Sequence, residues 1–178
     1  MKSAVGTYSS NYARKAVMNC KAAGIPISIA TAQPPETLFS LNQMRFLEYL
    51  GFETEYDYFF ARRNLNFDRF GSLKGYMFQY FIDRSFNPEK ILFFDDLQSN
   101  INLANALGIK TQKVSRNQME DDKIGITQQD FIEGMEKVNW QPELVIFDID
   151  GTLTQGNNIN YSILIDDNLE NYIKFNLL

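Results

Sequence analysis

The chain has 178 residues, of which 44% are hydrophobic, a length and composition that suit one domain (1–178) with a substantial core. The net charge of −5 argues against nucleic acid as a partner, because phosphate backbones select basic protein faces. The sequence contains no histidine, which excludes imidazole as a general base, a member of a catalytic triad or a metal ligand.

The cysteine count and the apolar runs indicate the cellular compartment in which the protein is expected. The single cysteine, Cys20, cannot form an internal disulfide, and its place in a helical pattern favours a small core residue over a catalytic thiol. No apolar run reaches the length of a membrane helix, and the N-terminus lacks the apolar region of a signal peptide. We therefore expect a cytoplasmic protein without a membrane partner.

Predicted helices and strands alternate along the chain. Helical spacing is found over 12–23, 35–51, 73–84, 99–107 and 127–138, where Thr127 is a candidate N-cap. Strands are expected over 25–32, 52–60, 90–96, 109–114 and 144–150, and a turn with a hairpin arm and a short helix over 157–178. The strand runs are apolar throughout, which indicates a parallel sheet covered on both faces. The expected fold class is α/β, with a three-layer, doubly wound parallel sheet.

Polar side chains follow the apolar runs at the point where ligands bind in such sheets, outside the carboxyl ends of the strands. They are Thr31, Asp95, Asp96, Asp148, Asp150 and Thr152, with Gly151 beside Asp150 and with Lys74 at the start of a helix. Four carboxylates, a hydroxyl and an ammonium at one edge would suit a divalent cation and a phosphate. Hard oxygen ligands favour Mg²⁺.

The motifs that carry these residues resemble those of the haloacid dehalogenase superfamily, whose members are mostly Mg²⁺-dependent phosphatases. "VIFDIDGTLT" (within 144–154) resembles the first motif and "ISIATA" (within 25–32) the second. Lys74 in "GSLKGYMFQYF" matches the third, and "KILFFDDLQSN" (near 91–100) resembles the fourth. The first and fourth motifs are specific, and the resemblance covers roughly Ala13 to Leu153.

The order of the motifs departs from the family, because here the first motif comes last. Circular permutation explains this order, with new chain ends between the first and second motifs. Exchange of the Asp148 strand between two chains of a homodimer explains it as well. In either case the strand before Asp148 is expected at the middle of the sheet, flanked by the strands that end at Thr31 and Asp96.

The resemblance implies a catalytic and metal-binding set. Asp148 would attack phosphorus and form an aspartyl-phosphate, and Asp150 would protonate the leaving oxygen and then activate water. Mg²⁺ would be bound by Asp148, by the backbone carbonyl of Asp150 and by the acidic pair, with Asp96 the closer ligand and Asp95 direct or through water.

The resemblance also implies a phosphate-binding set. Thr31 and Lys74 would hold the phosphoryl oxygens, and the backbone N–H groups near Gly151 and Thr152 would add donors. Thr31 has a plain alternative as a strand-end residue and Lys74 as a solvated helix-start lysine. The acidic pair could instead cap the following helix.

Two further stretches have two interpretations each. The basic stretch 61–63 either lies in a solvated loop or binds an acidic substrate. Asp166 and Asp167 either imitate the fourth motif or lie on a hairpin flap after the first motif. The connections around the site are too short for a large cap domain, which would suit a bulky phosphorylated substrate such as a protein.

The function expected from the resemblance is hydrolysis of phosphomonoesters. Two alternatives stay open: a binding module that keeps the fold and metal site without catalysis, and a phosphotransferase or phosphomutase that uses an acceptor other than water.

Overall fold

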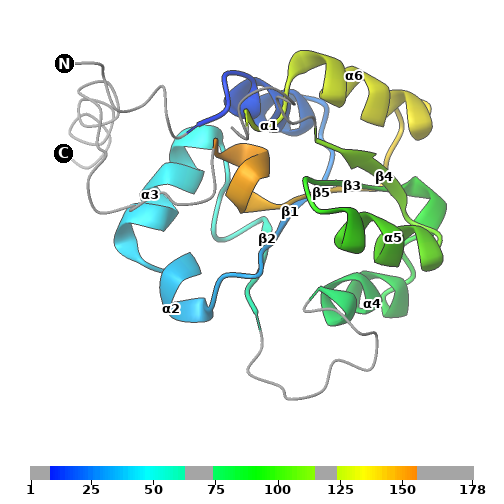
Figure 1. The fold of residues 1–178 in the computed structure, drawn as a ribbon, viewed down its shortest axis with the longest axis horizontal. Coiled ribbons are helices and arrows are strands. Elements are labelled where there is room, and N and C mark those ends of the chain that lie inside the picture. Colours follow the sequence, from blue (N-terminus) through cyan, green and yellow to red (C-terminus); the bar gives the residue numbers. More distant parts are fainter. Residues whose placement is uncertain (1–8, 63–73, 115–123, 156–178) are drawn as a thin grey trace.

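The computed structural model describes residues 9–62, 74–114 and 124–155. Within them the chain forms an α/β fold with a five-stranded sheet in the order β2-β1-β5-β3-β4 (Figure 1). The strands are β1 (Ile27–Ala30), β2 (Tyr58–Phe60), β3 (Ile91–Asp95), β4 (Lys110–Lys113) and β5 (Leu144–Phe147). All four strand pairs of this sheet are parallel, as the continuous apolar runs predict.

Helices pack against both faces of the sheet, which gives the doubly wound, Rossmann-like arrangement (Figure 1). The helices are α1 (Ala13–Ala22), α2 (Pro35–Leu38), α3 (Leu41–Leu50), α4 (Gly75–Asp83), α5 (Gln98–Ala106) and α6 (Gln128–Lys137). Side chains of α1, α3 and α6 share one core cluster, and those of α4 and α5 share the other. No helix in the described ranges has both the length and the apolar character needed to cross a membrane.

The last strand of the described chain lies at the middle of the sheet. β5 pairs with β1 on one side and with β3 on the other, all within one chain. This confirms the prediction that the strand before Asp148 is central. Because the chain supplies its own central strand, completing this sheet does not require a strand from a second copy.

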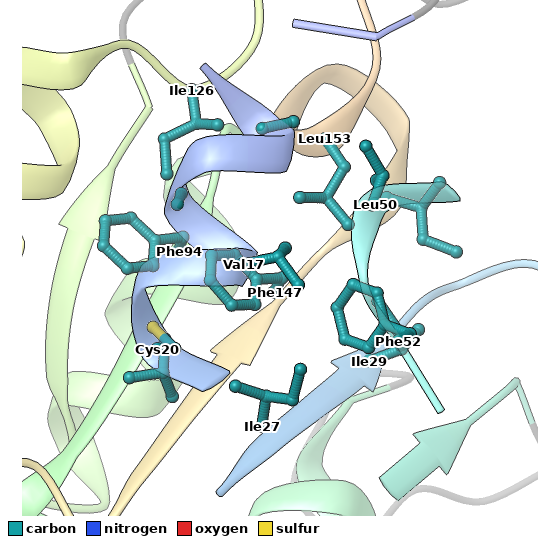
Figure 2. Packing of buried hydrophobic residues seen from close by; sticks show 14 of the residues in the cluster. Val17, Cys20, Ile27, Ile29, Leu50, Phe52, Phe94, Ile126, Phe147 and Leu153 are labelled. Carbon is teal, nitrogen blue, oxygen red and sulfur yellow. The ribbon is translucent and has the colours of Figure 1, made fainter. Parts of the chain in front are cut away.

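Alternate residues of β5 enter opposite cores, so the strand is buried on both faces. Val145 and Phe147 contribute to the cluster with α1, whereas Leu144 and Ile146 contribute to the cluster with α4. The rings of Phe147, the last residue of β5, and Phe94, the last but one of β3, stack with centroids 5.4 Å apart (Figure 2).

Cys20 lies in the same core as Phe147, as its helical position predicts (Figure 2). It is fully buried, and burial raises the pKa of its thiol to about 12. A neutral, inaccessible thiol is a packing group rather than a nucleophile.

The predicted helix over 35–51 is wrong in one respect, because the structure divides it into α2 and α3. The break is at Ser40, whose side chain accepts a hydrogen bond from the Gln43 N–H and donates one to the Thr37 carbonyl. A serine N-cap competes with helix continuation for these backbone groups. Gly51 ends α3 with φ of 113°, as its sequence position predicts.

The predicted strand over 52–60 is too long, since β2 begins only at Tyr58. The Asp57 carboxylate accepts a hydrogen bond from the Glu53 N–H at 2.7 Å, which closes a turn. Lys21 holds both acids, at 2.7 Å from Glu53 and 3.0 Å from Asp57. Side-chain bonds to a neighbouring helix therefore replace strand pairing here.

Several sequence predictions fall outside the described residues. These are Arg63 of the basic stretch, most of the polar loop over 116–125, and the tail with Asp166 and Asp167.

Candidate functional site

The register of the central strands brings Asp148 and Asp95 to the same edge of the sheet. Phe94 on β3 is the partner of Phe147 on β5, so the next residue of each strand emerges beside the other. The Asp148 N–H donates to the Phe94 carbonyl at 3.1 Å, which extends the pairing into the site. The backbone ladder thus fixes the separation of two carboxylates that are far apart in sequence.

Three carboxylates gather at this edge. Asp95, Asp96 and Asp148 each offer an oxygen, and these oxygens all lie within 4.8 Å of one another. Their side chains are almost fully buried, with Asp95 at 0%, Asp96 at 2% and Asp148 at 6% exposure. Carboxylates are rarely buried without a cation, so this cluster is a strong departure from ordinary packing.

Lys74 bridges two of the three carboxylates. Its ammonium lies 2.6 Å from Oδ2 of Asp95 and 2.6 Å from Oδ1 of Asp148. It is 1% exposed and stands over the ring of Phe93, with its nitrogen 5.5 Å from the ring centroid. The reading of Lys74 as a solvated helix-start residue is therefore wrong. A cation immediately before α4 is also disfavoured by the helix dipole, so the carboxylates account for its position.

Within this cluster the charged form of Asp148 is disfavoured. Burial raises the pKa of Asp148 well above its ordinary value; the Lys74 ammonium opposes this rise, and the charges of Asp95 and Asp150 add to it. Burial alone would lower the pKa of Lys74, but the two carboxylates outweigh it and raise that pKa. The Lys74 ammonium therefore offsets only part of the rise in the Asp148 pKa, and the charge of a bound divalent cation would oppose that rise further.

Asp95 is held by the first turn of α5 as well as by Lys74. Its Oδ1 accepts a hydrogen bond from the Leu97 N–H at 2.8 Å, and its Oδ2 accepts one from the Asn100 side-chain amide at 3.0 Å. Sequence reasoning assigned no role to Asn100. The signal that could have found it is its place in the first turn of α5, where a side chain reaches back to the strand end.

The turn after β5 carries the remaining residues of the first motif. The hydroxyl of Thr152 lies 3.5 Å from Oδ2 of Asp148, and the residue is fully buried. The N–H of Gly151, a predicted phosphate donor, donates here to the hydroxyl of Thr154 at 3.2 Å. Gly151 has φ of 78°, a conformation that favours glycine and allows the sharp turn.

Two distant segments clamp this turn, and sequence reasoning identified neither. The Ser10 N–H donates to the Leu153 carbonyl at 2.9 Å, and the Ile126 N–H donates to the Thr152 carbonyl at 2.7 Å. The Ser10 hydroxyl in turn donates to the Ile126 carbonyl at 2.7 Å. The position of Thr152 therefore depends on Ser10, near the first described residue, and on Ile126, just before α6.

Thr31 is fully buried at the end of β1, next to Gln33. Its hydroxyl accepts a hydrogen bond from the Gln33 N–H at 3.1 Å. The side-chain amide of Gln33 donates to both oxygens of Asp150, at 3.2 Å and 3.0 Å. This contact links the second-motif strand to the turn after β5 and was not predicted from the sequence.

The chemistry of the donor set fits Mg²⁺. The cluster offers three carboxylates and no nitrogen or sulfur ligand, which matches the preference of a hard cation for oxygen. Both oxygens of Asp95 accept protein hydrogen bonds, and Asp148 accepts one from the Lys74 ammonium through Oδ1. Three of the four predicted acidic residues, Asp95, Asp96 and Asp148, are thus brought together, and Asp150 is not part of this group. The roles of all four in metal and phosphate binding stay predictions.

A groove of about 610 Å³ lies apart from this cluster. Its lining includes Arg14, Lys21, Tyr49 and the stretch 51–56, which come from the ends of α1 and α3 and the turn before β2. None of the three clustered carboxylates is among its lining residues. We place the candidate site at the buried carboxylates because their oxygens lie close enough together to bind one metal ion.

Fold and site together define an α/β protein of the doubly wound, Rossmann-like class with a buried acidic cluster at the carboxyl edge of its sheet. Comparison of the chain with protein-family models finds no matching family, and comparisons with curated proteins and with solved structures find no match either.

Proposed function

We propose that this protein is a Mg²⁺-dependent phosphatase that hydrolyses phosphomonoesters through an aspartyl-phosphate on Asp148. The observation that carries the proposal is the meeting of Asp148, Asp95 and Asp96 at one buried point, with Lys74 between two of them. Phosphoryl transfer needs little covalent chemistry from a protein beyond a nucleophile, positioning and charge neutralisation. This cluster offers all three.

We further propose that the chain is a circularly permuted member of the haloacid dehalogenase superfamily. The central position of β5 between β1 and β3 supports this proposal, since these strands carry the first, second and fourth motifs. A second support is the antiparallel bridge between Ser9 and Thr154, which pairs the first described segment with the turn after β5. Ends created by opening the connection between the first and second motifs would lie beside each other in this way.

In this proposal Asp148, Asp96 and the backbone carbonyl of Asp150 hold Mg²⁺, with Asp95 direct or through water. When bound, the cation offsets the negative charge of the carboxylates and of the transferred phosphoryl group. Lys74 has a second task, because its ammonium neutralises phosphoryl oxygens next to the nucleophile. Thr31 and the backbone near Gly151 and Thr152 complete the phosphate-binding set.

The chemistry proceeds in two displacements. An Oδ atom of Asp148 forms a bond to phosphorus while the ester P–O bond breaks, and the leaving oxygen takes a proton from the Asp150 carboxyl. Asp150 then accepts a proton from water, whose oxygen bonds to phosphorus as the Asp148–phosphorus bond breaks. The products are an alcohol and inorganic phosphate, and both carboxyl groups return to their starting states.

The test is hydrolysis of 4-nitrophenyl phosphate with Mg²⁺ and with EDTA. We expect the activity to require Mg²⁺. In Asp148→Asn it should fall by roughly 10⁴-fold or more, which is the usual loss of rate when a covalent nucleophile is removed. Asp83→Asn is the matched control, because Asp83 is an exposed carboxylate at the end of α4. Activity that persists in Asp148→Asn would contradict the proposal.

The same assay separates the two alternatives. A native chain that binds Mg²⁺ in a calorimetric titration but turns over no ester is a binding module. Formation of a new phosphate ester when an acceptor alcohol is added identifies phosphotransfer. Phosphorylated small molecules and phosphorylated proteins are both to be tried as substrates, because the resemblance implies an open site with a minimal cap.

A further inference from the structure

Gln33 is a buried residue whose side chain is directed at the predicted acid–base group. It is 8% exposed and lies two residues after Thr31, just beyond β1. Its Nε2 donates hydrogen bonds to Oδ1 and Oδ2 of Asp150, at 3.2 Å and 3.0 Å. Asp150 comes from the turn after β5, 117 residues away in sequence, so the contact joins two separate strand ends.

The backbone of Gln33 is fixed from two sides. Its N–H donates to the Thr31 hydroxyl at 3.1 Å, and its carbonyl accepts from the Arg62 N–H at 2.8 Å. A glutamine held at both backbone groups and buried along its side chain has few rotamers open to it. The amide therefore offers its hydrogen-bond donors to the Asp150 carboxylate in a fixed direction.

Asp150 itself is less constrained by burial than the other acids. It is half-buried, whereas Asp95, Asp96 and Asp148 are buried. A carboxyl group on a turn rotates readily about its side-chain torsions unless a neighbour fixes it. Proton transfer to a leaving oxygen requires a heavy-atom separation of about 2.6–3.2 Å, so this rotation matters for catalysis.

We propose that Gln33 is a positioning residue that holds the Asp150 carboxyl group in the orientation from which it transfers a proton to the leaving oxygen. The inference rests on the proposed phosphatase function and deepens it. In this proposal Gln33 acts through the Asp150 carboxyl group and not directly on the phosphorus. In the first displacement the proton passes from Asp150 to the oxygen that leaves phosphorus, and in the second Asp150 takes a proton from the attacking water.

The test compares two esters that differ in their need for an acid. 4-Nitrophenolate leaves readily without a proton, whereas phenolate from phenyl phosphate depends on one. The kcat/KM values report formation of the aspartyl-phosphate, the step in which the leaving group departs. For Gln33→Met, which keeps the length of the side chain and removes the donor, we expect kcat/KM for phenyl phosphate to fall about tenfold more than for 4-nitrophenyl phosphate.

The ratio of the two kcat/KM values is insensitive to the fraction of folded protein, so partial unfolding of Gln33→Met cannot imitate the effect. Gln112→Met is the matched control. Gln112 is 7% exposed on β4 and also donates its amide to a carboxylate, that of Glu133 at 3.1 Å. We expect Gln112→Met to leave the ratio unchanged.

A double-mutant cycle with Asp150→Asn tests whether Gln33 acts through that carboxyl. In the Asp150→Asn background, Gln33→Met should cause no further change in the ratio. An equal fall in kcat/KM for both esters, or an additive effect in the double variant, would overturn the inference while leaving the phosphatase proposal in place. Absence of turnover of both esters by the native chain would overturn both.

Discussion

The ammonium of Lys74 lies 2.6 Å from Oδ1 of Asp148, and the two side chains are almost completely shielded from solvent. They are separated by 74 residues in sequence and come from the start of α4 and the end of β5. The ammonium also contacts Asp95, so one cation joins the two central strand ends. An ion pair in this environment stabilises the protein only if both charges keep their partners.

Replacing Lys74 by methionine should therefore destabilise the metal-free protein. Loss of the ammonium leaves Asp95 and Asp148 buried without it, and removing one partner of a buried pair costs about 3–5 kcal/mol. Urea denaturation in EDTA measures this change. Added Mg²⁺ should restore part of the loss, because the cation takes over the neutralising role.

Lys90→Met is the control for this prediction. The Lys90 ammonium lies 3.9 Å from Glu143, and the side chains are 55% and 40% exposed. Solvent screens such a pair, so the expected change is within about 0.5 kcal/mol. Equal stability of Lys74→Met and the native chain in EDTA would show that the buried pair contributes nothing.

A second prediction concerns the clamp around Thr152. Gly125 has φ of +70°, and a Cβ at this position would lie 2.5 Å from Cβ of Ser10 and 2.8 Å from the Thr152 carbonyl oxygen. Gly125→Ala should cost the backbone strain of a left-handed residue, about 1–2 kcal/mol, plus a further 1–3 kcal/mol, roughly, for overpacking. Thermal unfolding measures the sum.

Gly24→Ala isolates the strain from the overpacking. Gly24 has the same φ of +70°, but no described atom lies within 4 Å of a Cβ placed there. Its substitution should carry the strain cost alone and leave phosphatase activity unchanged, whereas Gly125→Ala should also reduce activity by displacing the Thr152 turn. Equal effects of the two substitutions would mean that Ser10 and the Thr152 turn accommodate the added methyl group with no further loss of stability or activity.

Much of the sheet could be predicted because its signals are local in sequence. The continuous apolar runs before Thr31, Asp95 and Asp148 predict buried parallel strands, and these are found. The capping box of α6 is equally local: Thr127 accepts from the Asp130 N–H, and the Asp130 carboxylate accepts from the Thr127 N–H.

The parts that could not be predicted depend on contacts between distant residues. The turn before β2 forms because Lys21, on α1, holds Glu53 and Asp57, and no local pattern reveals that pairing. Gln33 faces Asp150 only because β1 and β5 are neighbours in the sheet. The sequence could therefore locate the acidic cluster at a strand edge, while the residues that orient the cluster required the register of the sheet.

A third prediction follows from Cys20. Burial raises the pKa of its thiol from 9.0 to about 12, so the folded state binds the thiol proton more tightly than the unfolded state does. The associated stability is fully present below pH 9 and is lost as pH rises toward 12. Between about pH 8 and about pH 10.5 the native chain should lose about 2 kcal/mol more stability than Cys20→Ala. Urea denaturation at the two pH values measures this difference.

Because all other titrating groups are shared by the native chain and Cys20→Ala, they cancel in this comparison. A native chain and variant whose unfolding free energies fall in parallel would show that the thiol titrates alike in both states. Slow reaction of the native thiol with a maleimide at neutral pH is the companion measurement, since full burial blocks access.

The last prediction separates the roles of the two neighbouring acids at the end of β3, Asp95 and Asp96. Asp95 accepts hydrogen bonds from Leu97 and Asn100 and pairs with Lys74, so Asp95→Asn should lower the free energy of unfolding in EDTA, by roughly 1–3 kcal/mol. Asp96 is the proposed closer ligand. Asp96→Asn should therefore weaken Mg²⁺ binding at least about tenfold, as measured by calorimetry, while changing stability in EDTA less than Asp95→Asn does. The same chemical change at adjacent positions thus tests two tasks, anchoring of the cluster by Asp95 and cation binding by Asp96. If Asp95→Asn weakened Mg²⁺ binding more than Asp96→Asn did, the assignment of the closer ligand would have to be reversed.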